Sequence, residues 1–413
     1  MEHRESLFRI PDYPAWFGAD TFLLAGSAVH WIVLTTMAYQ LSGSLAVAGW
    51  FATVRGVVSS IAQVVGGTFI DRHDHRTLIL VQAGSCCVLW LFMGVMYLLG
   101  QLSFAIFAGC CICSSTVFGF LGGTTNAALI RVVGPERYPE AESVNQGRDS
   151  AVNTAGSPFG AVLFGISQAF PFFASAACDA LAFVCALFLR LPADDVKRTE
   201  EEASQSFIAD TVDGWRWALS SATIVSAVVI IGISQFGMFG THQAVNLSLV
   251  ERGVEPLFIS LANVGTAIGI MVGSVISARI CNRVPVGKGV PLVFLFMAAS
   301  YIPMAIDNSY PFVVLSTCLA SLPVPLLSAL LNGFVFSKTP TTKQGRTRAA
   351  IMTVIMLIGS FSGGVAGELI PRIGFTGFVV TMMILALLGA SVAAINPRLR
   401  SIPASPHWDE VDL

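Results

Sequence analysis

Long apolar stretches separated by short polar segments dominate this sequence of 413 residues. An α-helix rises 1.5 Å per residue, so about 20 apolar residues span the roughly 30 Å hydrocarbon core of a bilayer. Twelve stretches are long enough, at residues 15–40, 45–69, 77–99, 102–130, 141–169, 171–190, 221–249, 256–280, 289–306, 310–336, 347–370 and 375–396. The pattern predicts an all-α membrane protein with twelve transmembrane helices.

Composition supports a membrane protein and argues against several other classes. Apolar residues make up 54% of the chain and charged residues 12%, about half the charge of an ordinary soluble domain. The net charge of −2 argues against a nucleic-acid partner, which needs a concentrated basic surface.

We interpret the nine cysteines as packing residues, because none has disulfide or zinc-knuckle spacing. No Walker loop, metal-binding histidine pair or nucleophile elbow occurs, so we expect no enzyme, cofactor or metal.

The positive charges predict the topology. The first apolar stretch is long and lacks a signal-peptide cleavage site, so we expect it to be retained as a helix. If the N-terminus is cytoplasmic, Arg252 and Arg372 fall at outer loops and Arg55 and Arg148 within spans, while all other lysines and arginines fall on the cytoplasmic side. The positive-inside rule then predicts a multi-pass protein of a cytoplasmic (inner) membrane with both termini cytoplasmic.

The longest polar interruption divides the chain into two halves. We expect an N-terminal cytoplasmic segment 1–14, a six-helix bundle 15–190, a cytoplasmic linker 191–220, a second six-helix bundle 221–396 and a cytoplasmic tail 397–413. Within the linker, Phe207 to Leu219 has the pattern of an amphipathic helix, with Trp215 and Trp217 as interfacial anchors. Duplicated six-helix units are typical of transporters.

The residues from Gly66 to Arg76, a glycine pair followed by Asp-Arg and a further basic residue, resemble the loop signature between helices 2 and 3 of the major facilitator superfamily. The short motifs Leu41–Ser44, Gly214–Trp217 and Gly345-Arg346 are similar to the branch of the enterobactin exporter and the macrolide efflux proteins. Two features depart from the drug antiporters: Ser157-Pro158 stands where Gly-Pro is usual in helix 5, and helix 4 carries no arginine.

The resemblance implies a fold of two pseudo-symmetric six-helix bundles and a cytoplasmic gate. By resemblance the gate residues are Gly67, Asp71, Arg72 and Arg76, and Asp71 would lie near the positive end of a helix in the opposite half. Ordinary positive-inside anchoring is an alternative that explains Arg72 and Arg76 but not Asp71.

Ionisable residues within spans are the candidates for coupling, because a charge in the bilayer core costs several kcal/mol. The proton-coupling candidates are Asp20, Arg55, Asp149 and Asp179. Helical periodicity places Asp149 on one face with Asn153, Gly156 and Gly160, and directs Arg148 elsewhere, toward another acid. We predict that Arg55 pairs with Asp149 or Asp179; a static ion pair that orients helices is the alternative.

A polar and aromatic stripe in the seventh stretch is the candidate cargo surface. Gln235, Phe239, His242 and Asn246 share one helix face, with Gln243 beside them. By resemblance to the family, helices 1, 4, 7 and 10 line the cavity, so this stripe would face the substrate. His30, Trp31 and Arg148 are the candidates in the other half. Interhelical hydrogen bonds that only pack the bundle are the alternative.

Together these features predict a secondary active transporter. We expect a monomer in the lipid bilayer that exports a small amphipathic organic molecule, a siderophore or drug-like compound, by proton-coupled alternating access. One alternative is an importer of a siderophore or related metal chelate across the inner membrane, because a fold does not determine direction. A second alternative is a non-transporting membrane sensor on a transporter scaffold, against which the polar stripe and the charges within the spans argue.

Overall fold

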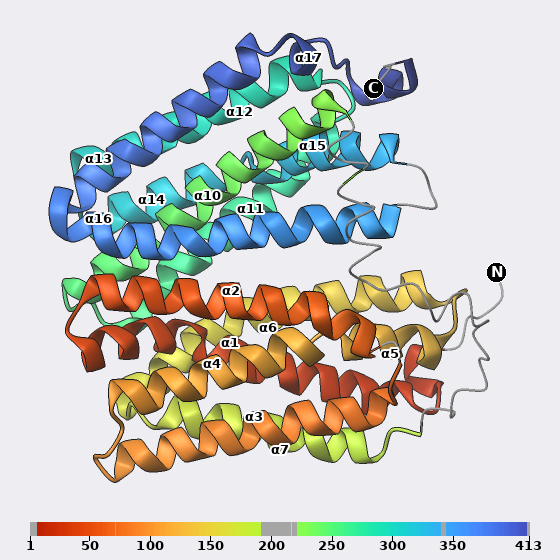
Figure 1. The fold of residues 1–413 in the computed structure, drawn as a ribbon, viewed down its shortest axis with the longest axis vertical. Helices are drawn as coiled ribbons and strands as arrows, with labels where there is room; N and C mark the ends of the chain where they lie inside the picture. The colour runs from red at the N-terminus through yellow and green to blue at the C-terminus, as the bar shows by residue number, and fades with distance from the viewer. Residues whose placement is uncertain (1–5, 71, 191–215, 217–220, 340–343, 411–413) are drawn as a thin grey trace. The chain divides into compact units, whose positions relative to one another are not determined.

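The computed structural model describes residues 6–70, 72–190, 216, 221–339 and 344–410. Within these ranges every regular element is a helix (Figure 1). Asp71 and almost all of the predicted amphipathic helix, including Trp215 and Trp217, lie outside the described residues.

Helices follow one another with short connections along the chain. The first elements are η1 (Leu7–Arg9), α1 (Tyr13–Ser42), α2 (Leu45–Ile70), α3 (His75–Leu98), α4 (Phe104–Leu121), α5 (Thr124–Val133), α6 (Tyr138–Ile166) and α7 (Phe170–Leu187). The later elements are α10 (Ala222–Glu251), α11 (Pro256–Ile280), α12 (Val286–Ser300), α13 (Ile302–Ile306), α14 (Tyr310–Ser321), α15 (Val324–Lys338), α16 (Gln344–Ile395), α17 (Pro397–Arg400) and η3 (Ser405–Glu410).

The described helices account for twelve membrane crossings. Ten segments are long and apolar enough to cross a bilayer. One of them, Ile351–Ile395, has 45 residues, and Figure 1 shows the chain reversing direction within α16. The reversal lies at Gly374, whose φ of 73° and ψ of 166° interrupt the helix. Counting two crossings there and adding the 29-residue α6 gives the twelve predicted helices, which confirms the all-helical membrane fold.

Three of the predicted single helices are interrupted in the structure. The stretch 102–130 forms α4 and α5, which are separated at Gly122 and Gly123, and 289–306 is divided at Tyr301 between α12 and α13. The stretch 310–336 forms α14 and α15, with Pro323 between them. Proline lacks the N–H that would continue the preceding helix, and it is favourable at the start of the next one.

The chain forms two compact units. Unit 1 consists of Met1–Gly43, Val54–Phe207 and Glu255–Ser260, and unit 2 of Ser44–Thr53, Ile208–Val254 and Leu261–Leu413. The boundary therefore falls within α2 and α11. The simple division into bundles 15–190 and 221–396 stays a prediction.

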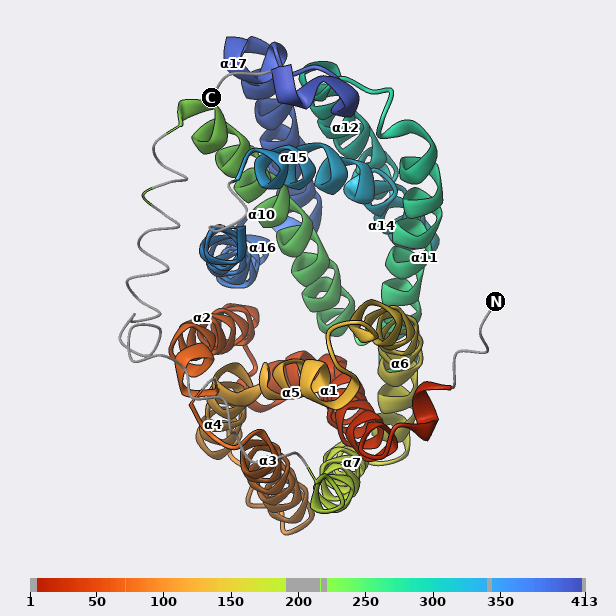
Figure 2. The ribbon, with the colours of Figure 1, turned by 90° about the vertical axis from the view of Figure 1, so that its right-hand side faces the viewer.

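In unit 1, α1 packs most extensively against α7 and α6, and α3 packs against α7 and α4 (Figure 2). Trp16 is fully buried and its Nε1–H donates to the carbonyl oxygen of Thr125 at 2.7 Å. A β-carbon on Gly160 would lie 1.9 Å from the carbonyl oxygen of Val29. Helix α6 therefore approaches α1 more closely than any residue with a side chain would allow.

In unit 2, α10 and α12 pack along α16 around an apolar core that includes Phe294, Leu330 and Phe334. The chain after α16 is fixed to this core, because Leu399 and Ile402 are each 1% exposed. The backbone N–H of Gly287 also donates to the carbonyl oxygen of Ile402 at 3.3 Å. Helix α17 is thus held firmly against unit 2.

Candidate functional site

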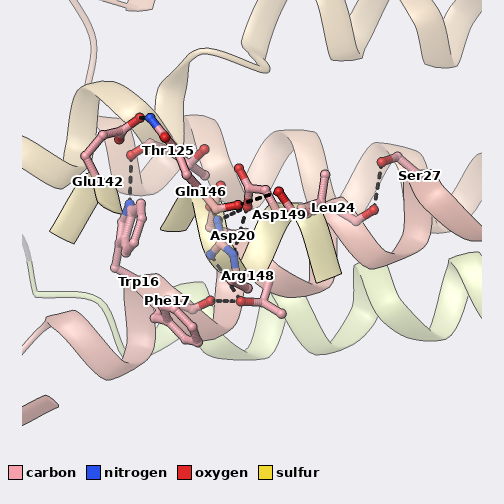
Figure 3. A network of polar contacts seen from close by, with 12 residues as sticks. Trp16, Phe17, Asp20, Leu24, Ser27, Thr125, Glu142, Gln146, Arg148 and Asp149 are labelled. Carbon is pink, nitrogen blue, oxygen red and sulfur yellow. Dashed lines mark hydrogen bonds and ion pairs between the residues drawn. The ribbon is translucent and has the colours of Figure 1, made fainter. Parts of the chain in front are cut away.

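A cluster of charged side chains lies in unit 1 where α1 and α6 meet (Figure 3). The guanidinium of Arg148 donates from Nη2 to Asp20, and from Nε and Nη2 to Asp149 Oδ1 at 2.9 and 2.6 Å. Its Nη1 donates to the hydroxyl of Thr21 at 3.1 Å. One cation therefore binds two carboxylates, one from each helix, and a hydroxyl group. We call Asp20, Arg148 and Asp149 the charged triad.

The triad is closed on one side and open on the other. The Arg148 side chain is 9% exposed and that of Asp20 is 16% exposed, whereas that of Asp149 is 44% exposed. The rings of Phe17 and Trp16 lie 5.0 and 5.9 Å from the guanidinium carbon, within cation–π range. Asp20 and Arg148 are thus held among aromatic rings, and Asp149 is the member that a proton reaches most easily.

The surface of α6 around Asp149 is polar. Gln146, Ser150 and Asn153 are exposed, and they follow one another at helical spacing on the same side as Asp149. Polar side chains exposed on a membrane helix face water rather than lipid, because lipid offers them no hydrogen-bond partner. The exposed side of the triad therefore faces water.

The small residues of α6 pack against α1. Gly156 and Gly160 share the predicted face with Asp149, but in the structure they contact α1. A β-carbon on Gly156 would lie 2.4 Å from that of Ala28. These glycines bring the two helices close enough for Arg148 to reach Asp20.

The predicted partnership of Arg55 is replaced by another. Arg148 is the cation at Asp149, and Arg55 Nε donates to Ser115 Oγ at 3.1 Å. Asp179 is 4% exposed, and among the described residues no cation forms an ion pair with it. Helical arithmetic fixes where a β-carbon points, but the guanidinium lies at the end of a long flexible side chain and can reach back to a neighbouring residue.

His30 and Trp31 do not form a common surface. His30 is 8% exposed and its Nδ1 lies 3.2 Å from the hydroxyl oxygen of Ser175. Its ring centroid is 4.0 Å from that of Trp90, inside unit 1. Trp31 is 57% exposed, as expected for adjacent helical residues, which point about 100° apart. A role for either in cargo binding stays a prediction.

One residue of the polar stripe of α10, Gln235, lines a cavity of about 70 Å³ inside unit 2. The polar lining of this cavity is Ser234, Gln235, Ser328 and Asn332. Asn332 Nδ2 donates to Ser328 Oγ at 3.1 Å. Neither Ser234 nor Gln235 has a side-chain hydrogen bond among the described residues. The cavity therefore presents an unpaired hydroxyl and an unpaired amide within an otherwise apolar wall.

The remaining stripe residues contact neighbouring helices. His242 Nδ1 lies 3.3 Å from Asn246 Nδ2, and Asn263 of α11 lies beside His242. A β-carbon on Gly359 of α16 would lie 2.6 Å from the Phe239 ring. Gln243 packs near α16 as well, with its Nε2 3.5 Å from the β-carbon position of Gly363.

The predicted gate residues lie at one end of α2 and α3. Gly67 is in the last turn of α2, and Arg72 is exposed after it. Arg76 donates to the carbonyl oxygens of Leu187 at 2.8 Å and Ala186 at 3.4 Å. These carbonyls end α7, where a cation is stabilised by the helix dipole. Within unit 1, Arg76 thus ties α3 to α7, and its role in gating stays a prediction.

Asp74 caps the N-terminus of α3 beside the gate residues. Its Oδ2 accepts from the backbone N–H and the hydroxyl of Thr77, at 2.9 and 2.6 Å. Burial alone would raise the pKa of Asp74, but these hydrogen bonds outweigh burial and hold its pKa below the ordinary value. Asp74 is therefore an acceptor that orders the start of the helix.

Sequence reasoning missed several residues that the structure places at these sites. Trp16 and Thr21 flank Asp20 on α1, and Ser234 and Asn332 line the cavity of unit 2. Trp16 lies four residues before Asp20, a spacing that puts both on one helix face. No local signal links Asn332 to α10, because the contact is made by the fold. Among the described residues, no group of three His, Cys, Asp or Glu side chains could hold a metal ion.

Comparisons with known proteins agree with this architecture. A bacterial homologue of the human lysosomal transporter Spinster, in an inward-facing and unoccupied conformation, is 12% identical with a TM-score of 0.70, over 96% of this chain and 99% of that chain. A POT family transporter in complex with 5-aminolevulinic acid is 15% identical with a TM-score of 0.70, over 94% and 96%. The human organic anion transporter MFSD10 is 15% identical with a TM-score of 0.60, over 94% and 100%.

At such low identities these structures show a shared fold and leave the cargo open. No curated protein matches the chain in sequence. The sequence does match the Major Facilitator Superfamily over residues 17–363, which is most of its length and includes both the charged triad and the α10 cavity residues. The chain is therefore a membrane transporter, not an enzyme, and it belongs to the major facilitator superfamily.

Proposed function

We propose that this transporter exports a small amphipathic organic molecule, a siderophore or drug-like compound, in exchange for protons by alternating access. The observation that carries the proposal is the charged triad, in which one guanidinium is shared by two carboxylates. With both carboxylates ionised the triad carries one excess negative charge. Binding one proton makes the triad neutral, so the arrangement favours a single proton-accepting step in a region where net charge is costly.

Asp149 is the proposed proton acceptor. It is the most exposed member of the triad, whereas Asp20 is bound to the same guanidinium in a more enclosed position. Protonation of Asp149 removes its negative charge and releases Arg148 from it. Arg148 keeps Asp20 and the Thr21 hydroxyl on α1. The contact between α1 and α6 thus changes with the proton while the cation remains paired, and each charge that moves down 100 mV releases about 2.3 kcal/mol.

The cavity of unit 2 is the proposed contact for the cargo. Its volume of about 70 Å³ accepts a fragment such as a hydroxyl, amide or catechol edge and not an entire siderophore. Ser234 and Gln235 supply the unpaired hydrogen-bonding groups there, which agrees with a cargo that has both polar and apolar parts.

The test uses the full-length protein. A thermal-shift screen against catecholate siderophores and macrolide antibiotics identifies a compound that binds, and that compound is then followed in proteoliposomes. We expect Asp149→Asn to retain exchange of the compound at equal pH and to lose transport driven by a pH gradient. Ser150→Ala is the matched control, because Ser150 is the adjacent exposed residue and its hydroxyl bonds only to its own helix. Full gradient-driven transport by Asp149→Asn would refute the proposal.

Direction needs a separate experiment in cells. Export predicts that deletion of the gene causes the unloaded compound to accumulate inside the cell. Import predicts that deletion abolishes growth on the iron-loaded compound as sole iron source. Accumulation of the unloaded compound would support the proposal, and loss of growth on the iron-loaded compound would support the importer alternative.

A further inference from the structure

A groove on unit 2 lies away from the α10 cavity, and the proposed cargo and proton sites do not use it. It has a volume of about 510 Å³, within the range of ligand sites. It lies along the last turns of α16 and the start of α17. Its lining includes Leu388, Ser391, Val392, Ile395, Asn396 and Arg398.

The wall of the groove is aliphatic. Leu388 is 55% exposed, Val392 is 43% exposed and Ile395 is 78% exposed. The hydroxyl of Ser391 donates to the carbonyl oxygen of Leu387 at 2.9 Å, so it is satisfied within its own helix. The groove therefore offers carbon surface to an acyl chain over most of its length.

One end of the groove is positively charged. Arg398 lines it, in the last turn of α17. Its side chain is exposed and forms no ion pair with a described residue. An aliphatic surface that ends in an unpaired guanidinium group matches the shape of a lipid with an anionic headgroup.

Arg398 is carried on a fixed segment. Leu399 and Ile402, each 1% exposed, anchor α17 in the core of unit 2. Asn396 Nδ2 donates to Ser226 Oγ of α10 at 2.9 Å, which fixes the junction between α16 and α17. The backbone that carries Arg398 is thus held in place before a ligand arrives, which lowers the entropy cost of binding.

We infer that this groove binds one anionic phospholipid, with an acyl chain against Leu388, Val392 and Ile395 and the phosphate at Arg398. The predicted topology puts the groove at the cytoplasmic leaflet, where anionic lipids attract basic residues. The inference is independent of the cargo and of proton coupling.

Native mass spectrometry of the full-length protein in detergent tests the lipid site. The protein is titrated separately with dioleoylphosphatidylglycerol and dioleoylphosphatidylcholine, and the first bound lipid is quantified. We expect tighter binding of phosphatidylglycerol. Arg398→Gln should weaken that binding about fivefold, the effect of one basic residue at an anionic lipid surface, and leave phosphatidylcholine unchanged. Arg279→Gln removes an exposed cation from α11 of the same unit. This control should leave the binding of both phosphatidylglycerol and phosphatidylcholine unchanged.

A second variant tests the acyl-chain part of the site. Ser391→Trp keeps the charges and fills the groove, and it should also weaken phosphatidylglycerol binding. Equal binding of the two lipids by the wild type, or unchanged binding in either Arg398→Gln or Ser391→Trp, would overturn the inference. Competition by millimolar glycerol 3-phosphate would also overturn it, because a free anion would then be the ligand.

Discussion

The stability of charged-triad variants should follow the burial of the residue that is changed. Arg148→Gln leaves two carboxylates together without their cation. The Arg148 side chain is 9% exposed. Its replacement therefore approaches the loss of one partner from a buried ion pair, which lowers the free energy of unfolding by about 3–5 kcal/mol. Asp20→Asn removes a charge that is 16% exposed and keeps Asp149 as a partner for the cation, so we expect about 1.5–3 kcal/mol, as for a hydrogen bond to a charged group.

Asp149→Asn should have the smallest effect on stability. Its side chain is 44% exposed, and solvent screening limits exposed ion pairs to about 1 kcal/mol or less. Arg148 also keeps Asp20 in this variant. The predicted order of destabilisation is therefore Arg148→Gln, then Asp20→Asn, then Asp149→Asn. The order for loss of proton coupling is different, because Asp149→Asn should abolish gradient-driven transport while costing little stability.

Thermal unfolding of the purified variants in one detergent at pH 7 measures the order. The double variant Arg148→Gln with Asp20→Asn adds a stronger test, because it removes one of the two carboxylates left without a cation. We expect it to be more stable than Arg148→Gln alone, a coupling that independent sites would not show. A wild-type unfolding temperature for Arg148→Gln, or strict additivity in the double variant, would show that the triad does not stabilise the contact between α1 and α6.

Three further predictions concern helix packing, helix capping and the cavity of unit 2. Gly160→Ala should destabilise the protein by about 1–3 kcal/mol through overpacking, because its β-carbon would lie 1.9 Å from a carbonyl oxygen of α1; unfolding temperature measures this. Asp74→Ala should cost about 1 kcal/mol through loss of the cap. Because the folded pKa of Asp74 is lowered, this difference should be constant above about pH 4 and shrink as pH falls further. Gln235→Leu should leave the unfolding temperature unchanged and weaken binding of the screened compound roughly tenfold, the upper range for one hydrogen bond.

Each of these predictions has a control in the same element or position. Gly165 of α6 has nothing within 4 Å of its β-carbon position, so Gly165→Ala should be close to neutral, and equal effects at the two glycines would contradict the packing argument. Asp74→Asn keeps a capping oxygen and should remove only the pH dependence. A loss of stability in Gln235→Leu would mean that the amide has a structural role, and unchanged binding would exclude the cavity as a cargo contact.

The helix pattern could be predicted from the sequence because each crossing is a local property. A run of about 20 apolar residues has one stable solution in lipid, a helix whose backbone is satisfied internally. The interruptions at Gly122–Gly123 and Pro323 were not predicted, because the sequence is equally apolar before and after each interruption. The polar helix α6 was predicted as a crossing because its length outweighed its charges.

The partners within the site could not be predicted to the same degree. Periodicity located Asp149 and Arg148 on α6, but it could not say that α1 lies beside α6 and brings Asp20 to the same place. That contact depends on Gly156 and Gly160, whose role becomes visible only when the opposing backbone is known. The sequence predicted that Arg148 would contact an acid other than Asp149. It did not identify that acid as Asp20, because the contact is made by the fold.

The contrast between the two sites gives a way to separate their functions. The charged triad of unit 1 holds groups that can exchange a proton, whereas the lining of the α10 cavity in unit 2 is uncharged and offers hydroxyl and amide groups. A proton step changes the net charge and needs a counter-ion nearby, but a neutral cargo needs only hydrogen bonds and apolar surface. If the functions are divided in this way, Gln235→Leu should raise the concentration needed for half-maximal transport without changing the number of protons moved per molecule. Asp149→Asn should change the proton count without changing cargo affinity. A single variant that altered both quantities together would show that cargo and proton share one site.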